Sequence, residues 1–241
     1  MKQKNIFLVI LLIAVVAVGV FALYGNVFAP HWDVKPAQII IQDKQITDNT
    51  KPFVIKISYP QIAGLDDFNQ KAKAIVDKEI TDFKTNSLAN DEAVKQNDPS
   101  GYAEFPREYE LDISYDQGEI DNNIVSVVFN VYSFEGGAHG SSYFVPLNYN
   151  PKLKTEIKLA DLFINQKDYL QKISTFCVAD LTNQITKYLG NTDGTWIQTG
   201  AGPTEENYHF FLINKGNLVF YFPQYQVAFG AAGDFKVTIP R

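Results

Sequence analysis

Two long amphipathic helix patterns constrain the fold of this chain more than any other feature. In the first, apolar residues recur at spacings of three and four from Leu65 to Phe83, with charged residues between them. The second runs from Gln166 to Leu189, and Gly190 stands where a C-terminal cap is expected. An amphipathic helix must bury its apolar face, and the segments around both helices are β-rich. Each helix is therefore expected to cover one face of a sheet.

The β-rich segments predict short strands joined by polar turns. We expect strands at 53–59, 109–115, 124–134, 143–149, 208–213, 218–222 and 235–239, and a short strand giving way to a helical turn over 155–163. Pro60 is expected to end the first of them, and the polar stretch 87–107 is expected to be a long surface loop. The predicted fold class is α+β, with mostly antiparallel sheets and two halves at 38–135 and 136–241.

Three shorter patterns refine this prediction. The polar residues 116–123 are expected to connect two strands as a hairpin loop, and Gly216 is expected to take a left-handed conformation in a turn at 214–217. The second helix is expected to bury one stripe of side chains, formed by Leu170, Ile173, Cys177, Leu181, Ile185 and Tyr188.

The first thirty residues predict export across a membrane. Lys2 and Lys4 precede an apolar run from Ile6 to Leu23, which is about 27 Å long as a helix and spans a bilayer core. Residues 1–29 are either a signal anchor or a cleaved signal peptide, since a small-residue cleavage pattern at 27–29 is followed by Pro30. Residues 30–37 are expected to be a tether, with Trp32 beside the membrane. The remainder is expected outside the cell membrane or secreted.

The charge of the exported part limits its partners. All 27 acidic residues lie after residue 30, against 19 basic residues there, which gives a net charge of −8. Nucleic acid is a poor partner for such a surface, whereas a basic protein would be attracted to it. Ordinary solubility is the simpler explanation of the charge.

Catalytic and metal-binding patterns are weak in this sequence. The three histidines, His31, His139 and His209, are far apart, and none belongs to a metal-binding motif. Cys177, the single cysteine, lies on an apolar helix stripe and is expected to be inert. We therefore expect no catalytic residue, no metal site and no cofactor. Acids that only the fold brings together could still form a glycosidase.

Two segments stand out as candidate binding surfaces. A strand-like run, 132–135, ends in the glycine-rich sequence Gly136–Gly140, which contains His139. These glycines allow a tight turn or the close approach of another backbone, and His139 is expected to hold that turn by hydrogen bonding. The second segment, Tyr225–Gly233, lies in an aromatic-rich region. The candidate binding residues are Gly136, Gly137, His139, Gly140, Tyr225 and Gly233.

Several of these segments resemble a known family. Residues 59–64, 132–140, 157–163 and 218–240 resemble the extracytoplasmic domain shared by the RsiV anti-sigma factor and the PdaC peptidoglycan deacetylase. The resemblance implies a PdaC-like half followed by an RsiV-like half. In the family, the RsiV version binds lysozyme and the PdaC version precedes a separate deacetylase domain.

The resemblance and the composition together predict a non-enzymatic, membrane-tethered, extracytoplasmic binding module. Its expected partner is lysozyme or another basic protein, or alternatively peptidoglycan glycan. A cell-wall hydrolase or modifying enzyme and a structural envelope protein are the other interpretations of the sequence.

Overall fold

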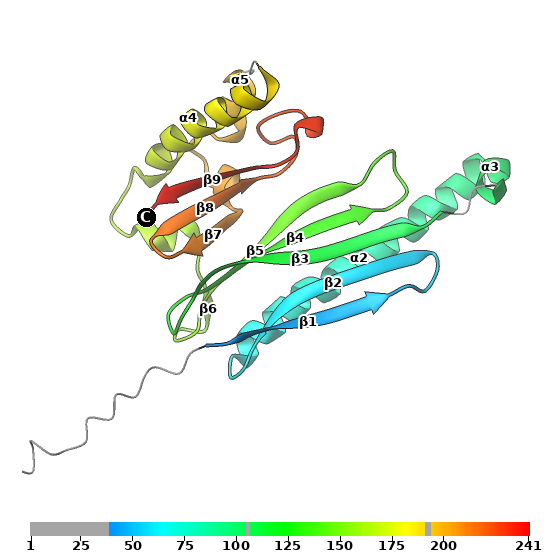
Figure 1. The fold of residues 1–241 in the computed structure, drawn as a ribbon, viewed down its shortest axis with the longest axis horizontal. Coiled ribbons are helices and arrows are strands. Elements are labelled where there is room, and N and C mark those ends of the chain that lie inside the picture. Colours follow the sequence, from blue (N-terminus) through cyan, green and yellow to red (C-terminus); the bar gives the residue numbers. More distant parts are fainter. Residues whose placement is uncertain (1–38, 105–106, 191–193) are drawn as a thin grey trace, which may run out of the picture. The chain divides into compact units, whose positions relative to one another are not determined.

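Two sheets, each with one long helix packed on a face, make up the part of the chain that the structure describes (Figure 1). The computed structural model describes residues 39–104, 107–190 and 194–241, and Ile39–Arg241 form one compact unit. Among the described strands only β2 and β3 pair in parallel. The predicted α+β class is therefore confirmed. The apolar run at 6–23, the tether at 30–37, His31 and Trp32 lie outside the described residues.

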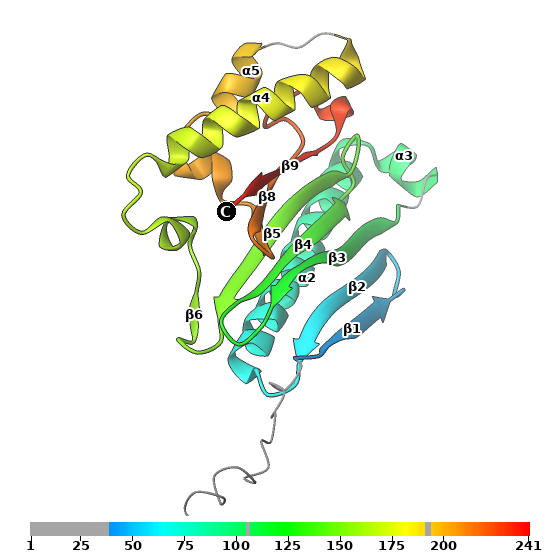
Figure 2. The same cartoon turned by 60° about the vertical axis from the view of Figure 1, so that its left-hand side comes forward.

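The first sheet has the order β1-β2-β3-β4-β5-β6. Its strands are β1 (Ile41–Asp48), β2 (Phe53–Ile62), β3 (Tyr109–Ile120), β4 (Val125–Phe134), β5 (Ser141–Asn150) and β6 (Thr155–Glu156). Helix α2 (Asp66–Asn97) and the short α3 (Pro99–Glu104) connect β2 to β3, and α2 covers one face of the sheet (Figure 2). The apolar stripe of α2, including Phe68, Ala72 and Val76, is buried against the strands.

The second sheet is smaller and has the order β7-β8-β9. Its strands are β7 (Phe211–Asn214), β8 (Asn217–Phe222) and β9 (Phe235–Pro240). Helix α4 (Tyr169–Leu189) packs on it through Ile173, Cys177 and Leu181, and ends at the left-handed Gly190 as predicted. The short elements around α4 are η1 (Leu159–Phe163), α5 (Gly194–Gly200), η2 (Glu205–Tyr208) and η3 (Gly230–Ala232).

The predicted loop at 87–107 is wrong, because α2 continues to Asn97 and α3 follows it. The helix was missed because polar residues continue its buried stripe: Ser87 and Asp91 are both buried. Asp91 is stable there because Tyr109 and Tyr102 donate hydrogen bonds of 2.6 and 2.9 Å to its two carboxylate oxygens. A buried stripe made of polar residues gives no hydrophobic periodicity.

Several strand predictions also need correction. Pro60 does not end β2 but pairs with Asp43 of β1, where its missing N–H breaks no bond to β3, since the β2–β3 pairing stops at Ile57. Strand β3 reaches Ile120, so the predicted hairpin loop is shorter than 116–123. Strand β7 starts at Phe211 rather than at 208. The exposed edge strand β1 and helix α5 were not predicted.

The first sheet extends beyond residue 135, where the sequence placed the end of the first half. Strand β5 pairs with β4 from Ser133–Ser141 to Val125–Tyr149, and β6 pairs with β5. The two sheets meet through an apolar cluster of Val128, Phe144, Leu212 and Tyr221. One prediction for α4 fails at its end, because the side chain of Tyr188 is 67% exposed rather than part of the buried stripe.

Within 39–241, apart from the two undescribed gaps, no helix combines the length and hydrophobicity that a membrane span requires.

Candidate functional site

The glycine-rich turn between β4 and β5 lines one cleft of the first sheet and contacts Tyr132, which lines a second cleft on the opposite face. Gly136 has φ +93°, and a Cβ atom there would lie 2.8 Å from the Tyr109 ring. At Gly140 a Cβ atom would lie 2.4 Å from the Tyr132 ring. The glycines therefore let these two aromatic rings pack against the backbone of the turn, as expected from their small size.

The first cleft, the helix-side cleft, lies between α2 and the ends of β4 and β5. Its volume is about 470 Å³. From α2 it is lined by Lys78, Glu79, Asp82, Phe83, Asn86 and Asn90, and from the strands and their turn by Leu111, Ser133, Glu135, Gly137, His139, Ser141 and Tyr143. The lining thus includes two of the predicted binding residues, Gly137 and His139.

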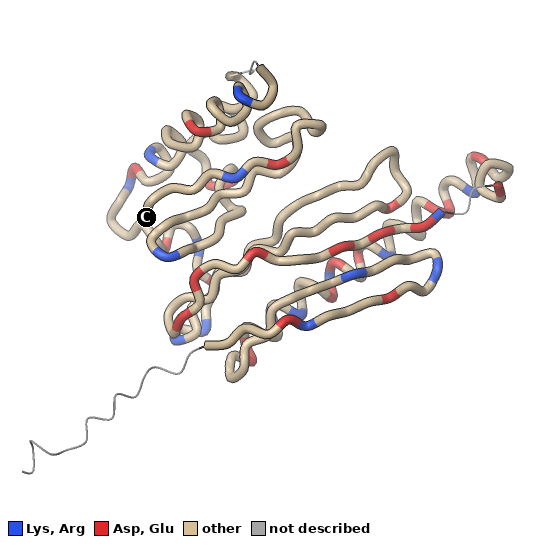
Figure 3. The backbone as a smooth tube through the Cα atoms, viewed as in Figure 1, with Lys and Arg blue, Asp and Glu red and all other residues tan. Residues whose placement is uncertain are grey.

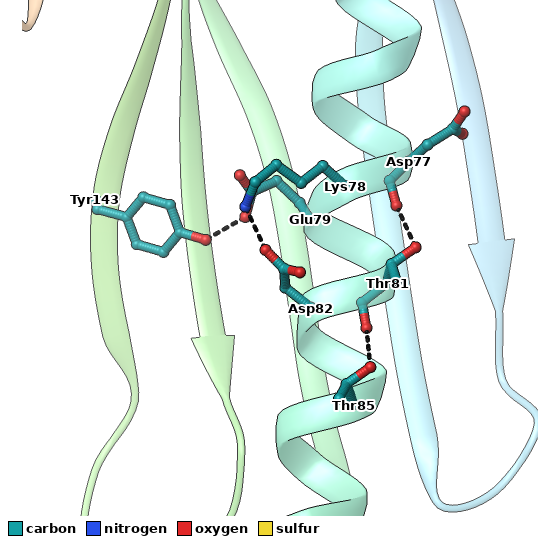
Figure 4. A network of polar contacts seen from close by, with 7 residues as sticks. All are labelled: Asp77, Lys78, Glu79, Thr81, Asp82, Thr85 and Tyr143. Carbon is teal, nitrogen blue, oxygen red and sulfur yellow. Dashed lines mark hydrogen bonds and ion pairs between the residues drawn. The ribbon is translucent and has the colours of Figure 1, made fainter.

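Two of the lining residues, Glu79 and Tyr143, form a carboxylate–tyrosine pair (Figure 4). Glu79 is only 8% exposed, and the Tyr143 hydroxyl donates a hydrogen bond to its Oε2 atom. Burial, together with this bond and the nearby negative charge of Glu79, raises the pKa of Tyr143, so the phenol stays protonated. The adjacent Lys78 ammonium is bonded to Asp82. Asn90 Nδ2 donates a 2.9 Å bond to the Glu135 carbonyl, which leaves Asn90 Oδ1 as an acceptor.

His139 is exposed and hydrogen-bonded within its own turn. Its Nδ1 atom lies 2.9 Å from the Gly140 carbonyl oxygen, which can only accept, so Nδ1 carries the proton. This bond agrees with the expected role of His139 in holding the turn.

Two other residues with reactive side chains lie outside both clefts. His209 is exposed beside the second sheet, and burial raises the pKa of the Cys177 thiol to about 12.

The second cleft, the open-face cleft, lies on the face of the first sheet that α2 does not cover. Its volume is about 390 Å³. It is lined mainly by alternate residues of β3, β4 and β5 and by the start of β9: Glu110, Asp112, Ser114, Asn130, Tyr132, Ser142, Phe144, Asp234 and Lys236, together with Val131 and Tyr143. Tyr132 pairs directly with Asp112 on one side and Ser142 on the other. Acidic positions recur along β3 (Figure 3).

The ion pair between Lys236 and Asp116 lies at the edge of the open-face cleft where β9 begins. Lys236 Nζ and the Tyr221 hydroxyl both bond to Asp116 Oδ2 at 2.8 Å. Burial alone would raise the pKa of Asp116, but these bonds outweigh burial and hold the pKa below its usual value. The charge of Lys236 is thus matched by Asp116, whereas Glu110, Asp112 and Asp234 form no ion pair with any described residue, although Lys56 neighbours Asp112 in the sheet.

The Tyr225–Gly233 segment forms the loop between β8 and β9 and leads into this cleft. Tyr225 is 57% exposed with φ +70°, a conformation that costs a non-glycine residue roughly 1 kcal/mol. Its ring lies against Gly230, and its carbonyl oxygen accepts a 3.0 Å bond from Trp196 Nε1. Gly233 has φ +82° and directly precedes Asp234 of the cleft.

The two predicted segments therefore flank one cleft, although most of its lining was not predicted. Gly140 supports the Tyr132 ring on one side, and Gly233 precedes Asp234 on the other. Sequence reasoning missed Tyr132, Asp112 and Asp234 as one group. A signal for part of it exists in the alternation Glu110-x-Asp112-x-Ser114, which places polar side chains on one face of a strand. Over the described ranges, no cluster of three His, Cys, Asp or Glu side chains could hold a metal ion.

Solved structures share this fold. A member of the DUF3298 family from Bacteroides fragilis superimposes with a TM-score of 0.53 at 20% identity, covering 84% of this chain and 90% of that one. A DUF3298 family protein from Pseudomonas aeruginosa gives a TM-score of 0.52 at 11% identity, covering 85% and 91%. At these identities the similarity establishes the fold alone.

Curated relatives are similar over part of their length. The peptidoglycan-N-acetylmuramic acid deacetylase PdaC of Bacillus subtilis is 26% identical over 198 residues, 81% of this chain and 39% of that protein. Esterase Rv3036c of Mycobacterium tuberculosis is 27% identical over 136 residues, 55% of this chain and 57% of that protein. The chain thus spans well under two thirds of either relative.

Family models match both halves of the chain. The family described as Deacetylase PdaC matches residues 46–142, and the family described as Protein of unknown function (DUF3298) matches residues 160–241. The first match ends within β5, whereas the second begins in η1, after the last strand of the first sheet. The chain therefore carries a PdaC-family region followed by a DUF3298-family region, the relationship that its sequence motifs predicted.

Proposed function

We propose that this protein is a non-enzymatic, extracytoplasmic binding module whose open-face cleft binds a glycan of the cell wall. The carrying observation is the cleft itself: an exposed tyrosine ring stands among hydrogen-bonding side chains on a sheet face. Tyr132 is 38% exposed, and its neighbours across the strands are Asp112 and Ser142. In this proposal the apolar run at 6–23 anchors the module in the membrane. Carbonate extraction of cell membranes tests the anchor, because an anchored protein stays in the membrane fraction.

The chemistry of the open-face cleft suits a sugar. A sugar ring offers an apolar face, which an exposed aromatic ring can cover, and a rim of hydroxyl groups that need donors and acceptors. Tyr132 provides the ring, and Phe144, which is 6% exposed, provides an apolar floor. Asp112, Ser114 and Asn130 provide hydrogen-bonding groups on the same face. The relationship to a protein named as a peptidoglycan deacetylase supports a wall glycan as the ligand.

A calorimetric titration of the full chain with a tetrasaccharide of alternating N-acetylglucosamine and N-acetylmuramic acid tests this proposal. We expect saturable binding that weakens roughly fivefold in Tyr132→Ala, because one aromatic stack contributes about 1 kcal/mol. Tyr132→Phe keeps the ring and should bind almost as well as the unchanged protein. Tyr188→Ala, which removes a more exposed tyrosine from α4, outside the cleft, is the control and should have no effect. Heat that does not saturate, or binding indifferent to Tyr132→Ala, would contradict the proposal.

A basic protein such as lysozyme is the second candidate partner, favoured by the acids at 110, 112 and 234 in the same cleft. A parallel titration with lysozyme at low and at physiological salt separates the two partners. Binding that survives physiological salt and weakens in Asp112→Asn would favour the protein partner, whereas heat only at low salt indicates nonspecific attraction.

A glycan hydrolase is the rival class, because the fold brings these same carboxylates into one cleft. Incubating the tetrasaccharide with the protein and separating the products by chromatography distinguishes the two. Cleavage that disappears in Asp234→Asn would favour the enzyme, and an intact tetrasaccharide supports the binding module.

A further inference from the structure

The loop between β8 and β9 holds an exposed tyrosine ring in a fixed position. Tyr225 is 57% exposed, yet its backbone is left-handed, with φ +70°, and its carbonyl oxygen accepts a 3.0 Å bond from Trp196 Nε1. The next residue, Gln226, donates bonds from Nε2 to the carbonyl oxygens of Gly200 at 2.8 Å and Asn207 at 3.1 Å. These bonds hold the strained backbone in place, so a rigid loop presents the Tyr225 ring to solvent.

The Tyr225 ring is seated in the same way as the Tyr132 ring of the open-face cleft. At Gly230 a Cβ atom would lie 2.1 Å from Cζ of Tyr225, and at Gly140 a Cβ atom would lie 2.4 Å from Cε2 of Tyr132. In both places the missing side chain lets the hydroxyl end of a tyrosine ring lie against the backbone. Each ring is therefore held by the protein on one side, while much of it stays exposed.

The two tyrosines belong to neighbouring parts of one surface. Tyr132 lines the open-face cleft together with Asp234, which directly follows Gly233 at the end of the loop. Figures 1 and 2 both show this loop near the turn between β4 and β5. Phe229, four residues after Tyr225, is 46% exposed and adds to the apolar area of the loop. Exposed aromatic area beside a cleft is typical of a binding surface.

A glycan chain is the ligand that suits an exposed ring next to a polar cleft. A sugar in the cleft meets the hydrogen-bonding groups around Tyr132, whereas the loop offers mainly aromatic area. The next sugars of the same chain can cover the Tyr225 ring with an apolar face and keep their hydroxyl groups in water. Because the ring is already fixed, this contact costs little side-chain freedom. The arrangement favours a polymer over a short fragment.

We propose that Tyr225 is a second aromatic subsite of the glycan site, so that the protein binds a chain extending from the open-face cleft across the β8–β9 loop. This inference rests on the proposed function and adds to it a preference for long glycan chains. Gly230 is the positioning residue of the subsite, because it lets the Tyr225 ring lie against the loop.

The test compares disaccharide, tetrasaccharide and hexasaccharide chains of alternating N-acetylglucosamine and N-acetylmuramic acid, titrated into the full chain by calorimetry. We expect the affinity of the unchanged protein to rise roughly fivefold or more from the disaccharide to the hexasaccharide, because the longer chain adds one aromatic stack. Tyr225→Ala should remove most of this gain and have little effect on the disaccharide, which the cleft holds. Tyr132→Ala should weaken the binding of all three chains.

Further variants separate positioning from direct contact. Gly230→Ala should weaken hexasaccharide binding as much as Tyr225→Ala does, because the added methyl group displaces the ring. The two substitutions combined should have no larger effect than Tyr225→Ala alone. Tyr225→Phe keeps the ring and should bind like the unchanged protein. Tyr188→Ala, which removes an exposed tyrosine from α4, is the control and should bind all three chains normally.

The outcomes distinguish failure of the subsite from failure of the proposed function. Equal affinity of the unchanged protein for all three chains, with Tyr132→Ala weakening each of them, would overturn the subsite and leave the proposed function standing. The absence of saturable binding to any chain would overturn both. Hexasaccharide binding that Tyr225→Ala leaves intact, with loss of lysozyme binding in the same variant, would assign the loop to a protein partner and overturn the subsite.

Discussion

Single buried polar residues carry much of the information that the hydrophobic pattern lacks. Asp91 shows this most clearly: it accepts bonds from Tyr109 and Tyr102 and pairs with Lys95 at 2.9 Å. The bond from Tyr109 contributes most to lowering the pKa of Asp91, and the bonds from Lys95 and Tyr102 add to it against the opposing effect of burial. The carboxylate therefore ties the end of α2 to the start of β3.

The Asp91→Asn substitution should reduce the free energy of unfolding at pH 7 by about 1–3 kcal/mol, because it removes a charged acceptor from the buried Tyr109 hydroxyl and breaks the pair with Lys95. The pKa of Asp91 is lower in the folded than in the unfolded protein, so its stabilisation is present above the ordinary pKa of about 4 and is lost as the pH falls through the lower folded value. Urea unfolding at pH 6 and pH 3 should therefore show a smaller pH effect in Asp91→Asn. Asp77→Asn, which breaks an exposed pair with Lys73, should change stability by under about 0.5 kcal/mol. An unaltered pH effect would contradict this role of Asp91.

Helix α2 forms one wall of the helix-side cleft, and only its first half could be predicted from the sequence. Its first half, 65–83, was predicted from a clear apolar stripe, and its second half was missed because the stripe continues as Ser87 and Asp91. Strand β3 could likewise be predicted only in part. Its inward side chains predicted a strand, whereas its outward acids, Glu110 and Asp112, become part of a cleft only through β4, β5 and β9.

Ser87 offers a test of how α2 packs. Its hydroxyl is buried and has no hydrogen-bond partner among the described residues. Replacing Ser87 with alanine should stabilise the protein by about 1 kcal/mol, because an unsatisfied hydroxyl is removed and alanine favours the helix. Thr85→Ala removes a hydroxyl that bonds to the Thr81 carbonyl on the exposed face, and should have a smaller effect. Urea unfolding measures both. A clear loss of stability in Ser87→Ala would show that the hydroxyl has a partner after all.

At the scale of the whole molecule, buried polar and apolar contacts join the two sheets. Asn148 of β5 is buried, accepts a 2.5 Å bond from the Ser126 hydroxyl and donates a 2.9 Å bond to the Phe211 carbonyl of β7. The Ile213 N–H donates a 2.8 Å bond to the Ser126 hydroxyl. With the apolar cluster of Val128, Phe144, Leu212 and Tyr221, these bonds join the sheets.

We expect calorimetry of the unchanged protein to show one cooperative unfolding transition. Asn148→Ala should reduce the free energy of unfolding by about 2 kcal/mol or more, because it leaves buried groups on both sheets without partners. Gln45→Ala, which removes an exposed bond to Ser58 within the first sheet, should cost less than about 0.5 kcal/mol. Two well-separated transitions in the unchanged protein would show that the sheets unfold independently.

The sequence by itself determined the features that depend on local repetition. The two helical stripes, the alternation in the strands, the cap at Gly190 and the turn at Gly216 all follow from residue spacing and backbone preference. The structure confirms them, except that the second helix begins at Tyr169 rather than at 166 and that Tyr188 is exposed. The family motifs likewise follow from short segments, and the comparisons confirm the relationship.

The tertiary structure alone decided which distant side chains meet. Glu79 on α2 meets Tyr143 on β5 across 64 residues, and Asp234 joins Asp112 and Tyr132 only because the second sheet packs on β3, β4 and β5. The position of β5 in the first sheet was also a tertiary outcome, since one strand sequence can pair with either neighbour. The physical reason is that local preferences act over a few residues, whereas a cleft is formed by strand pairing and packing between segments far apart in the chain.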